Sequence, residues 1–413
     1  MSGPVTAADS LAPAKALPMP QWELVILVAA LMSLNALAID IMLPALSNIS
    51  DFYSLTRDND QQLVIFAYIA GFGAPQLVFG PISDRYGRKG LLRICLVGYA
   101  IAGIACIMTS SFMTLLLARF IQGVFASGVR VIAVSIVRDL LAGRAMARIM
   151  SLVMTVFMVV PILAPTIGAG VMLFAPWQWT FALLSIAAML NLVWIQVRLP
   201  ETLTDEDRQP LNPEQSLKAY WQVVTTRVTF GYMCASGVIF GALFAFVAAS
   251  EQIFTDVFGK HETFALWFAG VAAALAISNF LNSRIVERFG MRRISHSVLI
   301  LFIALALINV ITLHTVGEKL WLFYPLFCLT FGCFGMLGAN FTAMAMEPQG
   351  KIAGTASAAY GFASTTFASL IGYLVAGQFN GTIAPFMWGF VVLGVSSLSI
   401  VFVTERFRLF RSR

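Results

Sequence analysis

The stretch Gly80-Pro81-Ile82-Ser83-Asp84-Arg85-Tyr86-Gly87-Arg88-Lys89 lies where one long apolar run, 61–82, gives way to another, 90–110. A helix that crosses a bilayer needs about 20 mostly apolar residues, and each run is long enough. The short connection between them carries Arg85, Arg88 and Lys89. Basic loops of this kind lie on the cytoplasmic side of a membrane. The stretch therefore predicts two membrane helices joined by a short cytoplasmic loop.

The same alternation of long apolar runs and short polar connections extends along the chain in both directions. Twelve runs are long enough to cross a bilayer, at residues 22–46, 61–82, 90–110, 113–137, 149–173, 178–198, 222–250, 263–283, 294–315, 320–342, 354–378 and 383–404. We expect an all-α membrane protein with twelve transmembrane helices.

The composition excludes the other broad classes of protein. Of the 413 residues, 59% are apolar and only 11% are charged, against about 25% charged in soluble domains. So few charges cannot cover a surface that faces water, and so much apolar surface cannot stay unfolded. The five cysteines lie in apolar runs without metal-binding spacing. We expect no cofactor, no metal and no nucleic-acid partner.

The positive charges orient the chain. With the N-terminus inside, 21 of the 26 Lys and Arg residues fall on the cytoplasmic side. The opposite side holds only Arg57, Lys260 and Lys319, and the remaining two, Arg119 and Arg130, fall inside runs. This asymmetry predicts that both termini are cytoplasmic and that the number of spans is even.

The longest internal polar segment divides the chain into two halves of six spans. We expect a cytoplasmic linker at 199–221 between an N-terminal six-helix bundle, 21–198, and a C-terminal one, 222–404. Residues 1–20 are predicted to be a disordered cytoplasmic tail, and 405–413 a basic cytoplasmic tail.

A trace of duplication supports two parallel repeats. Asp84-Arg85-Tyr86-Gly87 follows the second span, and Glu287-Arg288-Phe289-Gly290 follows the eighth, at the same place in the second half. Repeats of this kind build secondary transporters whose substrate site lies between the halves near the midplane.

Four segments carry a resemblance to a known family. The Gly80–Lys89 stretch resembles the loop between spans two and three of the major facilitator superfamily. Asp40-Ile41-Met42-Leu43-Pro44-Ala45-Leu46, Arg119-Phe120-Ile121-Gln122-Gly123 with Arg138-Asp139, and Pro161-Ile162-Leu163-Ala164-Pro165-Thr166-Ile167-Gly168 are similar to its bicyclomycin/chloramphenicol-resistance (Bcr/CflA) branch of drug/proton antiporters. Val160, Ala164 and Ala169 stand where the general antiporter motif has glycines.

The resemblance implies a major facilitator fold and proton-coupled efflux of amphipathic drug-like compounds, of phenicol or multidrug type, by alternating access. It implies a multi-pass monomer in the lipid bilayer of the bacterial inner (cytoplasmic) membrane, with drugs and protons as partners. The antiporter motif of Pro161, Pro165 and Gly168 favours export. The alternative is a proton-coupled metabolite importer or exporter of the same fold. An enzyme is disfavoured because no HExxH, GxSxG or P-loop motif occurs.

Charged residues within the predicted spans are candidates for proton coupling and for the substrate cavity. Asp40 lies deep in the first span, and intramembrane acids mark ion or proton pathways. The other reading is that Asp40 caps a helix break at Pro44 or sits in a permanent ion pair. Arg119 lies in the fourth span, and the resemblance ties its position to proton coupling.

Arg119 and Arg130 are 11 residues apart, which places them on one face of a helix with Gln122, Gly123, Ala126 and Ser127. We expect this face to look into the central cavity, because a charged stripe cannot face lipid. For Arg130, snorkelling toward the cytoplasmic surface is an equal alternative. Glu251, after the seventh span, is expected to be an interfacial loop acid.

The Gly80–Lys89 loop is a candidate cytoplasmic gate. We expect Asp84 to pair with a nearby arginine, with Arg138 as the candidate, or to meet the N-terminus of the eleventh span near Gly354. Gly80 and Gly87 are expected to allow tight turns, and Arg85, Arg88 and Asp139 complete the predicted cluster. The alternative is that the loop only anchors the topology.

The density of aromatic residues predicts the character of the cavity. With 34 phenylalanines in the chain, we expect aromatic and aliphatic walls with few polar anchors. Because Asp40 and Arg119, joined by Arg130 if it has a cavity role, would place both signs of charge there, neutral or zwitterionic substrates are expected.

Overall fold

The computed structural model describes residues 19–57, 59–141, 143–204, 206, 208 and 213–410, and within them the chain is helical without strands. The predicted tail at 1–20 falls almost entirely outside these residues. The first half contains α1 (Gln21–Asp40), α2 (Leu46–Phe52), α3 (Leu63–Gly73), α4 (Gln76–Tyr86), α5 (Arg88–Ile107), α6 (Phe112–Leu140), α7 (Gly143–Phe174) and α8 (Trp179–Arg198).

The remaining helices follow the linker. They are α9 (Pro213–Thr225), α10 (Arg227–Gln252), α11 (Phe264–Phe289), α12 (Met291–Val316), α13 (Leu320–Met346), α14 (Ala353–Ala376) and α15 (Ala384–Thr404). The chain after α15, predicted as a tail from residue 405, is described to residue 410.

The described residues contain 11 helices long and apolar enough to cross a membrane, or 12 if one bent pair counts as a single span. The bent pair is α3 with α4, which meet at an angle of 44°. Pro75 lies at this break, and proline interrupts the helical hydrogen-bond ladder. The all-α fold predicted from the twelve runs is confirmed.

Large apolar side chains cover the outside of the helices. Leu190 on α8 is 65% exposed, and Leu173 and Phe174 at the end of α7 are 79% and 91% exposed. In a soluble protein so many exposed apolar residues would be costly, whereas lipid provides an apolar surrounding. Together with the spans, this surface identifies a multi-pass membrane protein.

The seventh run begins later than the sequence predicts. The sequence predicts one helix over 222–250, but α9 ends at Thr225 and α10 begins at Arg227. Thr226 has extended backbone angles and separates the two helices. The final residues of the predicted linker thus belong to a separate helix, α9, which contacts α10 and α14.

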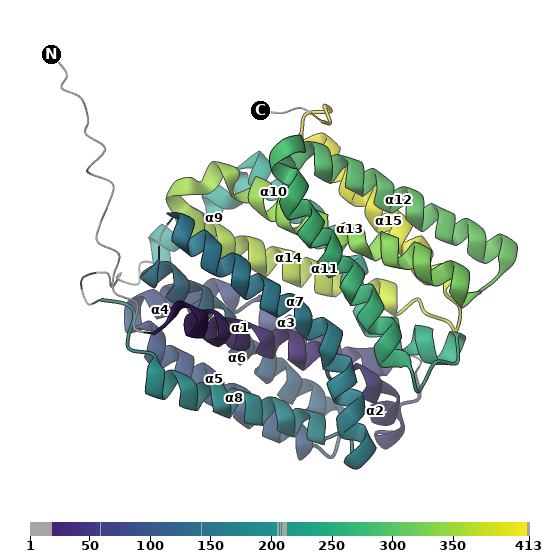
Figure 1. Ribbon diagram of the computed structural model, residues 1–413, viewed down its shortest axis with the longest axis horizontal. Helices are drawn as coiled ribbons and strands as arrows, with labels where there is room; N and C mark the ends of the chain where they lie inside the picture. Colours follow the sequence, from purple (N-terminus) through teal and green to yellow (C-terminus); the bar gives the residue numbers. More distant parts are fainter. Residues whose placement is uncertain are drawn as a thin grey trace.

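The helices pack in two groups, which lie one above the other in Figure 1. In the first group α6 packs on α3 and α5, and α7 packs on α1; in the second, α10 packs on α14 and α15, and α13 on α11 and α12. The groups meet along two seams, where α7 contacts α11 and where α14 contacts α3 and α4. The residue boundaries of the two bundles stay a prediction.

The two ends of the bundle differ. Figure 1 shows α4 and α9 at one end, called here the linker end, and α2 at the other, called the far end. At the linker end, α4 ends before Gly87 (φ +95°) and α11 ends before Gly290 (φ +81°). L-residues with a side chain rarely adopt this backbone conformation, so the duplicated glycine makes the same turn in both halves.

Candidate functional site: a cavity between the two halves

A cavity of about 900 Å³ lies between the two groups of helices toward the linker end. The first half contributes residues of α4 and α6, and the second half contributes residues of α10, α13 and α14. Charged or amide side chains in its wall are Gln76, Asp84, Arg130 and Arg138. The volume lies in the range that holds a drug-sized molecule.

Hydroxyl groups make this wall more polar than the sequence suggested. The Ser236 and Tyr360 hydroxyls lie 2.6 Å apart and join α10 to α14. Phe240 and Phe244 supply aromatic surface. The expectation of aromatic and aliphatic walls with few polar anchors is therefore wrong, because most phenylalanines pack inside the second half or face outward. The other hydroxyl-bearing residues of the wall are Ser135, Tyr220, Thr342, Thr355, Ser357, Ser364 and Thr365.

Tyr220 of α9 lies in the wall of the cavity. Its hydroxyl donates to the carbonyl oxygen of Leu77 on α4, at 2.9 Å. Burial raises the pKa of Tyr220, so the hydroxyl remains a proton donor at physiological pH. The linker helix thereby contacts both halves at the linker end.

The far end is closed by hydrogen bonds between the halves. Gln62 donates to the side-chain oxygen of Gln252 at 2.6 Å, and Gln252 donates to Asn59 at 2.8 Å. Asn59 in turn donates to the carbonyl oxygen of Phe379 at 2.8 Å. We call Ser47, Asn59, Gln62, Glu251 and Gln252 the far-end latch.

Glu251 is a buried member of this latch. It lies in the last turn of α10, is 3% exposed, and accepts a hydrogen bond from the hydroxyl of Ser47 on α2. Its other carboxylate oxygen has no partner among the described residues. The prediction of an interfacial loop acid is wrong, because α10 extends past residue 250 and continues into a π-helical turn, Ile253–Val257.

Asp40 ends α1 and is 5% exposed. No hydrogen bond or ion pair of its carboxyl group occurs among the described residues, so the structure offers no permanent partner for it. A 3₁₀ turn, Leu43–Ala45, with Pro44 follows directly, and the expected break in the helix is present. Asp40 does not line the cavity.

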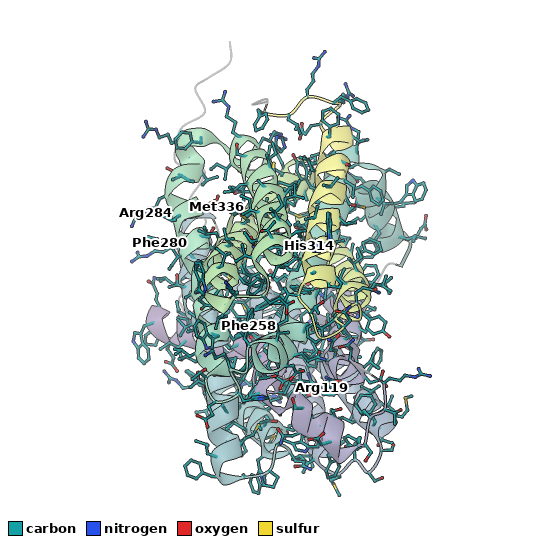
Figure 2. The ribbon with its side chains drawn as sticks, turned by 90° about the vertical axis from the view of Figure 1, so that its right-hand side faces the viewer. Arg119, Phe258, Phe280, Arg284, His314 and Met336 are labelled. Carbon is teal, nitrogen blue, oxygen red and sulfur yellow. The ribbon has the colours of Figure 1, made fainter. Side chains whose placement is uncertain are left out.

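Arg119 lies fully buried among the helices of the first half (Figure 2). It donates to the carbonyl oxygens of Ala38 and Val64, at 2.9 and 3.3 Å, and to the side-chain oxygen of Gln122 at 2.7 Å. Its guanidinium also lies 4.4 Å from the ring centre of Tyr68. Arg119 thus ties α6 to α1, two residues before Asp40, without forming an ion pair with it.

The predicted polar face of α6 reaches the cavity only at its Arg130 end. Close packing of α3 on α6 explains why the rest is enclosed: a Cβ atom at Gly123 would overlap the carbonyl oxygen of Tyr68, and one at Gly71 would overlap that of Phe120. Two glycines therefore let the helices meet. The prediction that Arg119 and Gln122 look into the cavity is wrong for this reason.

Arg130 lines the cavity, as its predicted cavity role requires. Its guanidinium lies 5.6 Å from the ring centre of Phe72. None of the described residues gives it a hydrogen bond or an ion pair.

At the linker end, Arg88 is the centre of an ion-pair cluster. It is 2% exposed and lies 2.6 Å from Asp84 and 2.8 Å from Asp139. Arg138, the partner expected for Asp84, lies 3.7 Å from it. Arg138 also reaches the start of α14, since a Cβ atom at Gly354 would be 3.0 Å from its nitrogen.

The rest of the Gly80–Lys89 loop differs in part from expectation. Gly87 makes a turn, and Glu201 of the linker accepts hydrogen bonds from the backbone N–H groups of Arg88 and Lys89, at 2.9 and 3.1 Å. Gly80 instead lies inside α4 with open space around it, so a tight turn at Gly80 is not observed. Arg85 is exposed.

The predicted antiporter motif lies within α7, which contains Pro161 and Pro165. A Cβ atom at Gly168 would overlap the carbonyl oxygen of Ile41, directly after Asp40. This glycine thus allows α7 to approach the broken end of α1.

The residues of the far-end latch were missed in the sequence, apart from Glu251. A signal was present: Asn59, Asp60, Gln61 and Gln62 form a polar cluster where the second span begins, and Gln252 follows Glu251. Polar residues at facing ends of two spans predict contact only once the pairing of the spans is known.

The comparison with known families decides the identity of the fold. The family model described as Major Facilitator Superfamily matches residues 26–373. The chain belongs to the major facilitator superfamily. The family resemblance found in the Gly80–Lys89 loop is thereby confirmed.

Relatives of similar length occur in several bacteria. The chain is 32% identical to the uncharacterized MFS-type transporter YdgK of Bacillus subtilis (92% of this chain, 95% of the relative). It is 28% identical to the bicyclomycin resistance protein homolog of Haemophilus influenzae (89% and 92%). It is 29% identical to the multidrug resistance protein MdtL of Escherichia coli (84% and 86%). The names of the last two relatives fit the Bcr/CflA branch.

Among solved structures, the chain is similar to the D-xylose-proton symporter, with a TM-score of 0.76 and 14% identity over 95% of this chain and 99% of that one. At this identity the likeness concerns the fold.

Proposed function

We propose that this major facilitator is a proton-coupled exporter of amphipathic drug-like compounds, of phenicol or multidrug type, in the bacterial inner membrane. The observation that carries the proposal is a cavity between the halves toward the linker end, in a structure whose halves are hydrogen-bonded to each other at the far end by the latch. Alternating access requires such a site, which opens to one side while the other is closed. The relatives named for bicyclomycin and multidrug resistance support drugs as substrates.

The predicted orientation of the chain determines which side of the membrane the cavity faces. If the basic loops and both termini are cytoplasmic, the linker end faces the cytoplasm, and the cavity is placed to take up substrate from inside. Transport then requires opening of the far-end latch and closure of the linker end. No covalent change of the substrate is involved, so the protein acts without catalysis.

Asp40 is proposed as the proton-binding group. A buried carboxyl group without a partner is costly when charged, and Asp40 lies at the junction of α1 with the 3₁₀ turn that leads to α2 and Ser47. Protonation and deprotonation of the Asp40 carboxyl group would change the charge at the broken end of α1. Arg119 is proposed to hold that end through Ala38 and to favour the carboxylate through its charge.

The Arg88 cluster is proposed as the gate of the linker end. Asp84 forms no bond with α14 among the described residues, although both line the cavity. When the end closes, Asp84 can approach the positive N-terminus of α14. Arg138, which already lies beside Gly354, would move together with Asp84.

The second candidate is transport of a small metabolite by the same fold. The hydroxyl-bearing wall favours it, because such groups bind polar substrates. Uptake of radiolabelled chloramphenicol into inverted membrane vesicles separates the two. We expect accumulation above the equilibrium level only when the vesicle interior is acidic. Equal uptake by vesicles without the protein would contradict drug export.

A further inference from the structure

The cavity wall carries three charged side chains, and two of them are already paired. Asp84 lies 2.6 Å from Arg88 and 3.7 Å from Arg138. Arg88, behind the wall, is shared with Asp139. The acids near the cavity are therefore neutralised by neighbouring arginines, and Arg130 is left as the charge without a counter-ion.

Arg130 offers hydrogen-bond donors that nothing in the described part of the chain uses. A guanidinium has five N–H donors in a planar fork and no acceptor. Here one aromatic ring, Phe72, lies 5.6 Å from it. A partly enclosed charge without a partner is unfavourable. An anion bound beside Arg130 would give this charge a partner, so the position favours an anionic ligand.

The neighbouring wall fits a molecule with one anionic end. Phe240 and Phe244 supply apolar surface, and Ser135 on α6 adds a hydroxyl to the same cavity as Arg130. Arg is suited to carboxylates because its fork matches their two oxygens.

We propose that Arg130 binds the carboxylate of amphipathic organic anions, so that the exporter prefers anionic over neutral forms of the same compound. This deepens the proposed function and rests on it, since it assumes that the cavity holds the substrate. It replaces the expectation that neutral or zwitterionic substrates are favoured, which assumed that Asp40 faces the cavity.

Two compounds with the same aromatic body test the proposal. Chloramphenicol is neutral, and its succinate ester carries a carboxylate. Isothermal titration calorimetry on the purified full-length protein in detergent gives both affinities. We expect the ester to bind at least about tenfold more tightly, as a hydrogen-bonded charge pair implies.

Variants assign the preference to one residue. Arg130→Gln should remove the tenfold preference and Arg130→Lys should retain part of it. The matched control is Arg284→Gln: Arg284 is exposed, lies 5.1 Å from the ring centre of Phe280, and points outward from α11 in Figure 2. The Arg284→Gln variant should keep the wild-type preference for the ester over chloramphenicol.

Three outcomes contradict the proposal in different ways. Equal affinity of the wild type for both compounds overturns it and leaves drug export standing. A preference that survives Arg130→Gln, in a protein that elutes as a single species, overturns the assignment to Arg130. Failure of the wild type to bind either compound counts against the proposed drug substrate and against this inference together.

Discussion

The hydroxyl of Ser47 on α2 donates a hydrogen bond to the buried carboxylate of Glu251 on α10, 204 residues away in the sequence. Ser47 is exposed whereas Glu251 is 3% exposed. The bond therefore joins an accessible part of the first half to an enclosed acid of the second. A second acid, Asp256, lies close by, because the hydroxyl of Thr255 contacts the carboxylates of both Glu251 and Asp256. Opening the far end must break this bond.

Loss of the Ser47 hydroxyl should favour opening of the far end. Ser47→Ala leaves Glu251 without its donor across the halves, and a hydrogen bond of this kind contributes about 1 kcal/mol, or roughly a fivefold shift in population. Distances between spin labels at positions 57 and 261 measure the shift. Ser50→Ala, in the same helix, is the control. Identical distance distributions for the two variants would remove the Ser47–Glu251 bond from the latch.

Asp40→Asn should separate proton coupling from substrate movement. The amide is nearly the same size but carries no titratable proton. We expect uphill uptake into acidic inverted vesicles to fall to the level of passive equilibration, while exchange of external for internal substrate without a gradient continues. Undiminished uphill uptake would exclude Asp40 as the coupling group.

Arg119→Lys should weaken both stability and coupling. The ammonium keeps the charge but lacks the planar fork that donates to Ala38, Val64 and Gln122 in the wild type. Each buried acceptor left unpaired costs about 1–3 kcal/mol. Thermal unfolding in detergent should shift to lower temperature, and uphill uptake should decrease. A fully wild-type melting curve would show that the three bonds are replaceable.

Asp84→Asn should stabilise the state with an open linker end. The variant cannot offer a full charge to the N-terminus of α14, an interaction of about 0.3–1 kcal/mol. Spin labels on the linker ends of α4 and α14 should show a larger mean distance, with slower turnover. Arg85→Gln, in the same loop but exposed, serves as the control. If both variants behave as wild type, the loop acts only as a topological anchor.

Gly168→Ala should disturb the contact between α7 and the end of α1. The added methyl group would overlap the carbonyl oxygen of Ile41, and overpacking costs about 1–3 kcal/mol. Gly170→Ala, two residues further along α7, is the matched control because nothing lies within 4 Å of its position. We expect only the first variant to lower thermal stability and uptake. Equal thermal stability and uptake of the two variants would show that α7 can move away from Ile41 without loss of stability.

The hydropathy pattern was sufficient for the spans, because lipid imposes length and apolarity on each helix separately. It failed at α9, since Val223 and Val224 were joined to the apolar residues that follow Arg227, although Thr225, Thr226 and Arg227 separate them. The turn at Gly87 was predictable from its motif. Helical spacing placed Arg119 and Arg130 on one face, but which neighbour covers that face depends on glycine contacts between α3 and α6.

The most direct test of proton-coupled export follows the proton itself. Inverted vesicles are given an acidic interior, monitored with a pH-sensitive dye, and chloramphenicol is then added. We predict that the substrate dissipates the gradient in vesicles with the wild-type protein and not in those with Asp40→Asn. A gradient that chloramphenicol leaves unchanged in the wild type, under conditions where the substrate is taken up, would contradict the account.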